Sequence, residues 1–346
     1  MKGVNKSFSE KVTSIQKKKR IYIFLLFLAL IVMTVFATSW GSYKIKINEI
    51  ITIYESIFIK VDEIHDENSV SIILNVRTPR ILMSALVGAS LSLSGLLFQG
   101  VFRNPLVEPY VLGISSGAAC GAAFSIVFGL FPIEVSSFLF SILAMFIAYF
   151  IATKNKSTPL VNLILAGLIV SSIFTSILNY LKIISSDSSL REISFWLMGG
   201  FYTSDSASVL KLLPVFILGF IISLVFSWKL NILTMGNEEA KSLGINIEFV
   251  KAVLILTATL LCSTSVSQVG IISWIGLMIP HITRLSSGTD HRYLIPITCL
   301  LGASFMIACD SIARTLIMGE IPISIVTSLL GSPYLVYLLR SKRKMY

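Results

Sequence analysis

The stretch I-L-M-S-A-L-V-G-A-S-L-S-L-S-G-L-L-F-Q-G-V, residues 81–101, contains 21 consecutive residues without a charged side chain. A helix needs about 20 apolar residues to cross the hydrocarbon layer of a membrane, which is roughly 30 Å thick. This stretch therefore predicts a membrane-spanning helix. Its small residues, among them Gly88 and Gly95, also predict close packing, because small side chains let helix backbones approach one another in lipid.

Nine further apolar runs accompany this one along the 346-residue chain. They cover residues 21–40, 111–131, 135–152, 160–184, 209–228, 249–269, 271–285, 294–313 and 321–339. Only 13% of the residues are charged, whereas soluble domains carry about 25%. We therefore predict an all-α, polytopic membrane protein with about ten transmembrane helices. A basic segment, residues 1–20, precedes a single transmembrane domain, residues 21–346.

Basic residues gather at both ends of the chain. Residues 17–20 read K-K-K-R, and residues 340–344 read R-S-K-R-K. Because Lys and Arg favour the cytoplasmic side of a membrane, both termini are predicted to be cytoplasmic. This distribution accounts for the net charge of +10, so nucleic-acid binding is not predicted. The first run is interpreted as a retained span, because it is long for a signal peptide and lacks a small-residue cleavage site.

The sequence offers little material for catalysis. It has no H-E-x-x-H helix and no G-x-x-x-x-G-K-[ST] loop to cradle nucleotide phosphates. Asp310 and Arg314 stand four residues apart, the spacing of an ion pair on one helix face. His281 follows Pro280 and is interpreted as a helix-end or packing histidine. No catalytic residue, metal site or cofactor is predicted, and four cysteines are expected to be small core residues: Cys120, Cys262, Cys299 and Cys309.

An aromatic segment, S-F-W-L-M-G-G-F-Y at residues 194–202, is too short to span a membrane. Aromatic residues are enriched at the level of the lipid headgroups. We therefore predict a short helix at the outer interface. A re-entrant element that contacts substrate is the alternative.

One loop on the predicted cytoplasmic side has the pattern of a helix of its own. It reads T-M-G-N-E-E-A-K-S-L-G, residues 234–244. Asn237 is predicted to cap a short helix, with Glu238 and Glu239 in its first turn and Gly244 at its C-terminal stop. A docking element and a solvated surface helix fit this pattern equally well.

Four stretches, in this order, closely resemble permease subunits of ABC importers for iron-siderophores, haem and cobalamin. The first is R-T-P-R-I-L-M-S-A-L-V-G-A-S-L-S-L-S-G-L-L-F-Q-G-V-F-R-N-P-L-V-E-P-Y-V-L-G-I-S-S-G-A, residues 77–118. The others are W-L-M-G-G-F (196–201), G-L-M-I-P-H-I-T-R-L (276–285) with T-D-H-R (289–292), and E-I-P-I-S-I-V-T-S-L-L-G-S-P (320–333). The resemblance extends from residue 77 to the C-terminus.

The resemblance implies a cobalamin-importer-like permease fold that works as a homodimer or beside a related subunit. It also implies two ATPase subunits, an extracytoplasmic substrate-binding protein and a lipid environment as partners. No cofactor is implied, because ATP would be hydrolysed by the separate subunits. The implied location is the cytoplasmic membrane of a prokaryote.

The resemblance also assigns roles to three sets of residues. The ATPase-coupling element corresponds to Gly236, Asn237, Glu238, Glu239, Ala240, Leu243 and Gly244, which favours docking for that loop. The arginines that meet acidic residues of the binding protein correspond to Arg77, Arg80 and Arg314. The cytoplasmic gate corresponds to Asn104, Pro105, Leu106, Leu160 and Val161.

Physical chemistry adds one expectation about the docking arginines. Arg80 follows Pro79 at a helix start, where an exposed guanidinium could pair with carboxylates of a soluble partner. Snorkelling to the lipid headgroups is the alternative role.

The leading functional hypothesis is a permease that translocates an iron(III)-siderophore or a similar large chelate, such as haem or cobalamin. An ion-coupled secondary transporter is the alternative. A membrane anchor for a cytoplasmic complex is a third class.

Overall fold

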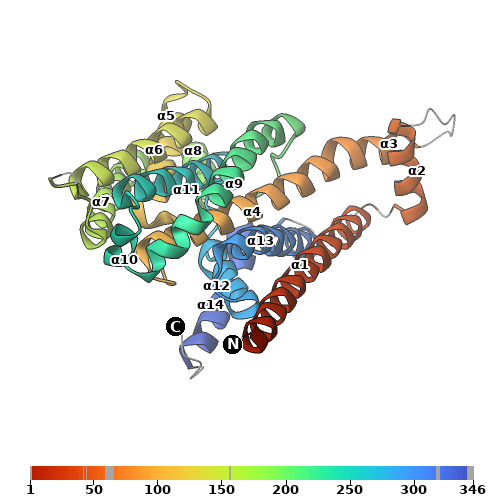
Figure 1. The fold of residues 1–346 in the computed structure, drawn as a ribbon. Helices are drawn as coiled ribbons and strands as arrows, with labels where there is room; N and C mark the ends of the chain where they lie inside the picture. The colour runs from red at the N-terminus through yellow and green to blue at the C-terminus, as the bar shows by residue number, and fades with distance from the viewer. Residues whose placement is uncertain are drawn as a thin grey trace.

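A computed structural model describes residues 2–41, 43, 45–58, 66–155, 157–316 and 320–340, which form helices joined by loops (Figure 1). The prediction of an all-α fold is confirmed. In chain order the elements are α1 (Lys2–Ser39), α2 (Ile47–Phe58), α3 (Glu67–Ser71), the π-helical turn η1 (Ile72–Arg77), α4 (Thr78–Phe102), the 3-10 turn η2 (Pro109–Leu112), α5 (Ile114–Phe128), α6 (Ile133–Ala152), α7 (Leu160–Ile184), α8 (Asp187–Met198), α9 (Ser206–Met235), α10 (Asn237–Ser242), α11 (Ile247–Val269), α12 (Ile275–Ser287), α13 (His291–Thr315) and α14 (Ile323–Arg340).

Seven helical stretches in the described part of the chain are long and apolar enough to cross a membrane. They are Gln16–Ser39, Glu67–Phe102, Ile133–Ala152, Leu160–Ile184, Ser206–Met235, Ile247–Val269 and His291–Thr315. Two shorter apolar helices lie in α5 and α14. Nine of the ten predicted runs are thus apolar helices, and the polytopic architecture is confirmed.

The predicted span at residues 271–285 is the exception. There α12 begins at Ile275 and has 13 residues, which is about 20 Å at 1.5 Å per residue. That length is shorter than the hydrocarbon layer, so the prediction of a full span here is wrong. The preceding helix, α11, ends at Val269, and residues 270–274 are not helical; the last of them, Trp274, has a φ of 75° and is the N-cap of α12.

The central element is α4, which contacts α9, α11, α12 and α13. In the spanning stretch that contains it, 83% of the most apolar window is buried. A Cβ added to Gly95 would overlap the carbonyl oxygen of Gly276 on α12, and one added to Gly88 would overlap that of Gly302 on α13. The predicted close packing of this small-residue helix is confirmed.

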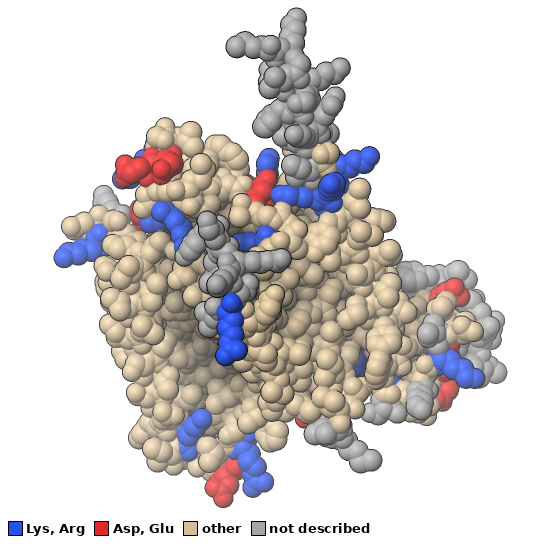
Figure 2. All heavy atoms as spheres, turned by 90° about the horizontal axis from the view of Figure 1, so that it is seen from below, with Lys and Arg blue, Asp and Glu red and all other residues tan. Residues whose placement is uncertain are grey.

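The outer helices expose apolar side chains. Only 11% of the apolar window of α1 and 22% of that of α9 are buried. Figure 2 shows a broad surface of uncharged residues on the face seen from below, with charged side chains mostly toward its edges. Such a surface suits lipid, where exposed apolar groups carry no hydration penalty. The four cysteines are free and buried, as predicted.

The aromatic segment forms part of α8, but the predicted bounds are wrong. The helix starts at Asp187, where Ser186 accepts a hydrogen bond from the backbone N–H of Ser189. It ends before Gly199, whose φ is +64°. A left-handed residue of this kind stops a helix, so residues 199–202 form a loop.

Figure 1 shows the beginning of α1 and the end of α14 at the same end of the bundle. We call this end, which also holds α10, the inner end. The opposite end, where α4 begins, is the outer end.

Candidate functional site

The outer end carries a cluster of ion pairs that joins three segments. This outer ion cluster consists of Arg80 on α4, Asp310 and Arg314 on α13, and Glu320 before α14. Nε and Nη2 of Arg80 donate to the carboxylate of Asp310 over 2.8–3.2 Å. Nη1 of Arg80 donates to Oε1 of Glu320 over 2.6 Å. Nε of Arg314 lies 3.2 Å from Oδ2 of Asp310, so the predicted ion pair within α13 is confirmed.

The expectation of an exposed guanidinium at Arg80 is wrong. Arg80 and Asp310 are only 7% and 1% exposed, because α13 packs along α4 at this point. Charges taken out of water are stable only when they are paired and hydrogen-bonded. The cluster meets that condition through the carboxylates of Asp310 and Glu320. Whether Arg80 meets a binding protein stays a prediction.

The other two predicted docking arginines converge on the last turn of α1. Nη1 of Arg77 donates to the carbonyl oxygen of Thr38, and Nη2 of Arg314 donates to that of Ala37. The last carbonyls of a helix lack partners within the helix and carry partial negative charge. These arginines therefore tie the end of α1 to η1 and α13, which is a structural role whatever else they do.

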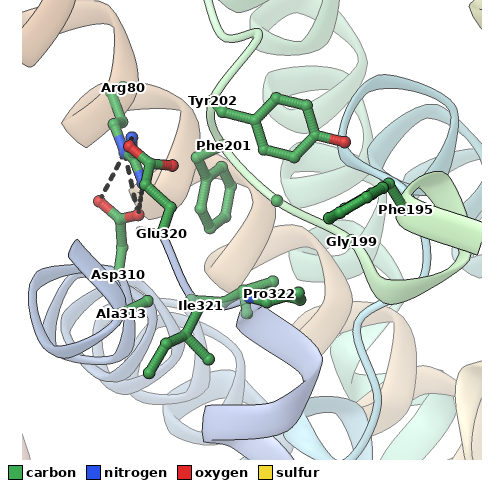
Figure 3. A pocket seen from close by; sticks show the side chains of 12 residues that line it. Arg80, Phe195, Gly199, Phe201, Tyr202, Asp310, Ala313, Glu320, Ile321 and Pro322 are labelled. Carbon is green, nitrogen blue, oxygen red and sulfur yellow. Dashed lines mark hydrogen bonds and ion pairs between the residues drawn. The ribbon is translucent and has the colours of Figure 1, made fainter. Parts of the chain in front are cut away.

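A cavity of about 300 Å³ opens beside the cluster (Figure 3). Arg80, Asp310 and Glu320 lie on one side of it, and the rings of Phe195 and Tyr202 lie on the other. The segment after Glu320 closes the floor, where the N–H of Ile323 donates to the carbonyl oxygen of Gly199 over 3.1 Å. This chamber combines ionic and aromatic walls.

Sequence reasoning missed two parts of this chamber. In the sequence, Glu320 stands out only as the first residue of the stretch 320–333 that resembles the importer permeases. Its partner Arg80 lies 240 positions away. Tyr202 was assigned to a helix at the membrane interface, whereas it stands in the loop that lines the cavity. No local pattern in the sequence signals either contact.

At the inner end, residues 236–244 form the short helix that the sequence predicts, with one correction. Gly236, not Asn237, is the N-cap, and no side chain caps the helix. The side chain of Asn237 instead accepts a hydrogen bond from Nη2 of Arg103, at the end of α4. This contact draws Asn237 away from the backbone N–H groups that it was predicted to cap.

The predicted stop at Gly244 is confirmed. Gly244 has a φ of +72°, its N–H donates to the carbonyl oxygen of Lys241, and the N–H of Ile245 donates to that of Ala240. These two bonds form a Schellman motif, which favours glycine at this position. Ala240 is buried, whereas the side chain of Glu238 is 86% exposed and Leu243 is also exposed. The helix therefore presents Glu238 and Leu243 to a partner or to solvent.

The predicted gate residues lie at the same end, in the loop after α4 and in the first turn of α7. Asn104 directly follows Arg103 and accepts a hydrogen bond from the N–H of Leu106 over 3.0 Å, which shapes the loop that includes Pro105. Leu160 and Val161 line a groove of about 650 Å³ together with Asn237. The structure thus brings the predicted gate residues and the predicted coupling helix together. Their roles in transport stay predictions.

A polar network that sequence reasoning did not identify supports this inner end. Nδ2 of Asn231 donates to Asp290, and Oδ1 of Asn231 accepts from the backbone N–H of His291, each over 2.9 Å. Burial raises the pKa of Asp290, but hydrogen bonds from Arg292 and Asn231 outweigh it and lower the pKa to about 2. The network fixes the end of α9 to the start of α13, beside α10.

Comparison with known proteins agrees with this architecture. The model of the FecCD transport family matches residues 28–341. The molybdate import permease MolB of Haemophilus influenzae is 37% identical over 326 residues, which cover 92% of this chain and 96% of MolB. The cobalamin import permease BtuC of Halobacterium salinarum is 37% identical over 279 residues, which cover 80% of this chain and 75% of BtuC.

A solved ABC transporter described as being of metal-chelate type, in an inward-facing conformation, has the same fold. Its TM-score is 0.83 at 36% identity, and the match covers 92% of this chain and 99% of that one. Permeases of this family carry no catalytic domain of their own, so an ABC importer permease implies separate ATPase and binding-protein partners. An ion-coupled carrier is thereby excluded. This chain is a multi-pass permease subunit of an ABC importer and belongs to the FecCD transport family.

Proposed function

We propose that this permease translocates a large metal chelate, an iron(III)-siderophore or a related compound such as haem or cobalamin. The resemblance to chelate-importer permeases supports this cargo, as do the metal-chelate transporter and the cobalamin permease among its relatives. A second copy of the chain or a paralogue would complete the path. Two ATPase subunits would bind at the inner end, which would be cytoplasmic, and a binding protein would deliver cargo at the outer end.

The observation that carries the proposal is the contact between the predicted coupling helix and the predicted gate. Arg103 ends α4, binds Asn237 of α10 and directly precedes the gate loop. A force that an ATPase applies to α10 would therefore reach residues 104–106 through one side chain. It would also reach Leu160 and Val161, which share a groove with Asn237.

A second path leads from the gate to the outer end through α4 itself. This helix has 25 residues, a length of about 38 Å. Most of its residues are buried, and close-packed interiors have low compressibility and transmit strain. Arg103 at one end and Arg80 near the other would therefore respond to the same displacement.

The proposal is tested by reconstituting the permease with its ATPase and binding protein in liposomes. Uptake of a radiolabelled ferric siderophore, of haemin, of cobalamin and of molybdate is measured with and without ATP. ATP-dependent uptake of one of the three chelates is the expected result. Uptake of molybdate alone, the cargo named for MolB, would replace the chelate by an oxyanion, and uptake without ATP would contradict the importer mechanism.

A further inference from the structure

Glu320 occupies the place on Arg80 that an acidic residue of a docking partner would need. Of the two carboxylates on Arg80, the side chain of Asp310 is 2% exposed and that of Glu320 is 45% exposed. Asp310 also pairs with Arg314 and is held from two sides. Among the contacts of Arg80 with the described residues, only the bond from Nη1 to Glu320 is therefore open to exchange.

We propose that Glu320 is an internal competitor for docking, which a carboxylate of the binding protein displaces from Arg80. This inference rests on the proposed docking of a binding protein at the outer end. It concerns how that docking is regulated by a residue of this chain.

The route to Arg80 runs through the outer cavity. Arg80, Asp310 and Glu320 all line this cavity, and Asp310 holds the Nε and Nη2 side of the guanidinium, which leaves Nη1 to Glu320. Phe195 and Tyr202 form the opposite wall and are 58% and 55% exposed. An acidic side chain on a loop of the partner could enter here, with its apolar part against the rings and its carboxylate at Nη1.

The charge balance favours exchange over simple loss of Glu320. Two arginines, Arg80 and Arg314, pair with two carboxylates, Asp310 and Glu320, and Arg77, which donates to backbone carbonyl oxygens, adds a third positive charge close enough to Arg314 to interact with it. Removal of Glu320 alone would raise the excess of positive charge from one to two. An incoming carboxylate restores the balance, while the half-exposed Glu320 moves into water at little cost.

Displacement of Glu320 would also loosen the start of α14. The segment from Glu320 to Ile323 is tied by three contacts: the ion pair to Arg80, the bond from the N–H of Ile321 to Ala313, and the bond from the N–H of Ile323 to Gly199. Docking would remove the first of these. Docking of the binding protein would therefore leave the start of α14 with fewer contacts to the rest of the chain.

The test compares Glu320→Gln with wild type in the assembled transporter, held in nanodiscs at low ionic strength. The affinity for the binding protein is measured by biolayer interferometry. Loss of a partly exposed competing ion pair is expected to tighten binding about fivefold. Glu320→Asp keeps the charge but shortens the side chain, so it should increase the affinity for the binding protein by less. This variant replaces Glu320→Gln in the test if the glutamine variant does not fold.

Glu192→Gln is the matched control, because it removes one negative charge from an exposed position of α8 near the same cavity. An equal gain in this control would show a long-range field effect and overturn the competition. Unchanged or weaker binding of Glu320→Gln would overturn it as well. If the wild-type transporter binds no binding protein at all, the proposed function fails, which is a different result.

A second readout requires no partner. Phenylglyoxal modifies accessible arginines, and peptide mass spectrometry reports the rate at Arg80. We expect faster modification of Arg80 in Glu320→Gln than in wild type, with no change in Glu192→Gln. An equal rate in all three proteins would mean that Glu320 does not cover Arg80, and the proposal would be wrong.

Discussion

The charged residues at the two ends of α4 differ in burial and in their partners. Near the beginning of the helix, Arg80 is almost completely buried and has two carboxylates within the chain. At its end, Arg103 is exposed and reaches the neutral side chain of Asn237, beside the exposed Glu238. The charge of Arg80 is thus satisfied by buried or half-buried partners within the chain, whereas Arg103 and Glu238 at the inner end are exposed. Substitutions at the outer end should therefore act mainly on stability, and those at the inner end on coupling.

The largest effect is expected for Asp310→Ala. The substitution leaves Arg80 and Arg314 buried without their shared carboxylate, which costs about 3–5 kcal/mol. We expect a large drop in melting temperature in detergent, or failure to accumulate in the membrane.

The double variant Arg80→Met with Asp310→Leu is the control for this cost. Replacement of both charges leaves one buried arginine, Arg314, without its carboxylate instead of two, so the double variant should be more stable than Asp310→Ala. A loss below about 1 kcal/mol for Asp310→Ala would show that the cluster is hydrated, and the contrast between the two ends would disappear.

Charge reversal on α10 should affect transport rather than stability. Glu238→Lys combined with Glu239→Lys changes exposed charges that would face an ATPase, so we expect ATP-dependent uptake to fall about tenfold, equivalent to about 1.4 kcal/mol. The affinity for the binding protein should stay at the wild-type value, since the outer end is unchanged. Unaltered uptake would contradict a coupling role for α10.

Two glycines with left-handed backbone allow a matched test of the inner end. Gly244 ends α10 with a φ of +72°, and Gly129 ends α5 with a φ of +64°; a Cβ would meet no atom within 4 Å at either position. Alanine should cost about 1 kcal/mol of stability in both, because L-residues disfavour this conformation. Only Gly244→Ala is expected to lower uptake, and an equal loss in Gly129→Ala would assign the effect to stability.

Local features of this chain could be predicted from the sequence, and contacts over long distances could not. The length of an apolar run depends on neighbouring residues alone, so α4, α6, α7 and α9 were predicted within a few residues, apart from the longer C-terminal part of α9. Gly244 was recognised as a helix stop for the same reason. The N-cap was misassigned because Arg103, 134 positions away, binds Asn237.

The burial of Arg80 shows the same limit. The position of Arg80 after Pro79 at a helix start led to the expectation of an exposed guanidinium, but α13 and Glu320 cover the side chain. The partner of a charged residue in a folded bundle depends on which helices meet, and this information is spread over the whole chain. The resemblance to known permeases identified the residues without showing these contacts.

The smallest effect on stability is expected for Lys241→Gln. Its comparison with Lys251→Gln tests whether burial decides how much an ion pair contributes to stability. Each lysine pairs with a glutamate three residues earlier, at 3.2 Å from Glu238 and 3.0 Å from Glu248. The side chain of Lys241 is 65% exposed and that of Lys251 is 6% exposed. An exposed pair contributes less than about 0.5 kcal/mol, so Lys241→Gln should leave the melting temperature unchanged. Lys251→Gln should lower it, because Glu248 loses a buried partner. Equal melting temperatures in the two variants would mean that burial does not decide how much such a pair contributes, and the contrast drawn between buried and exposed charges would lose its basis.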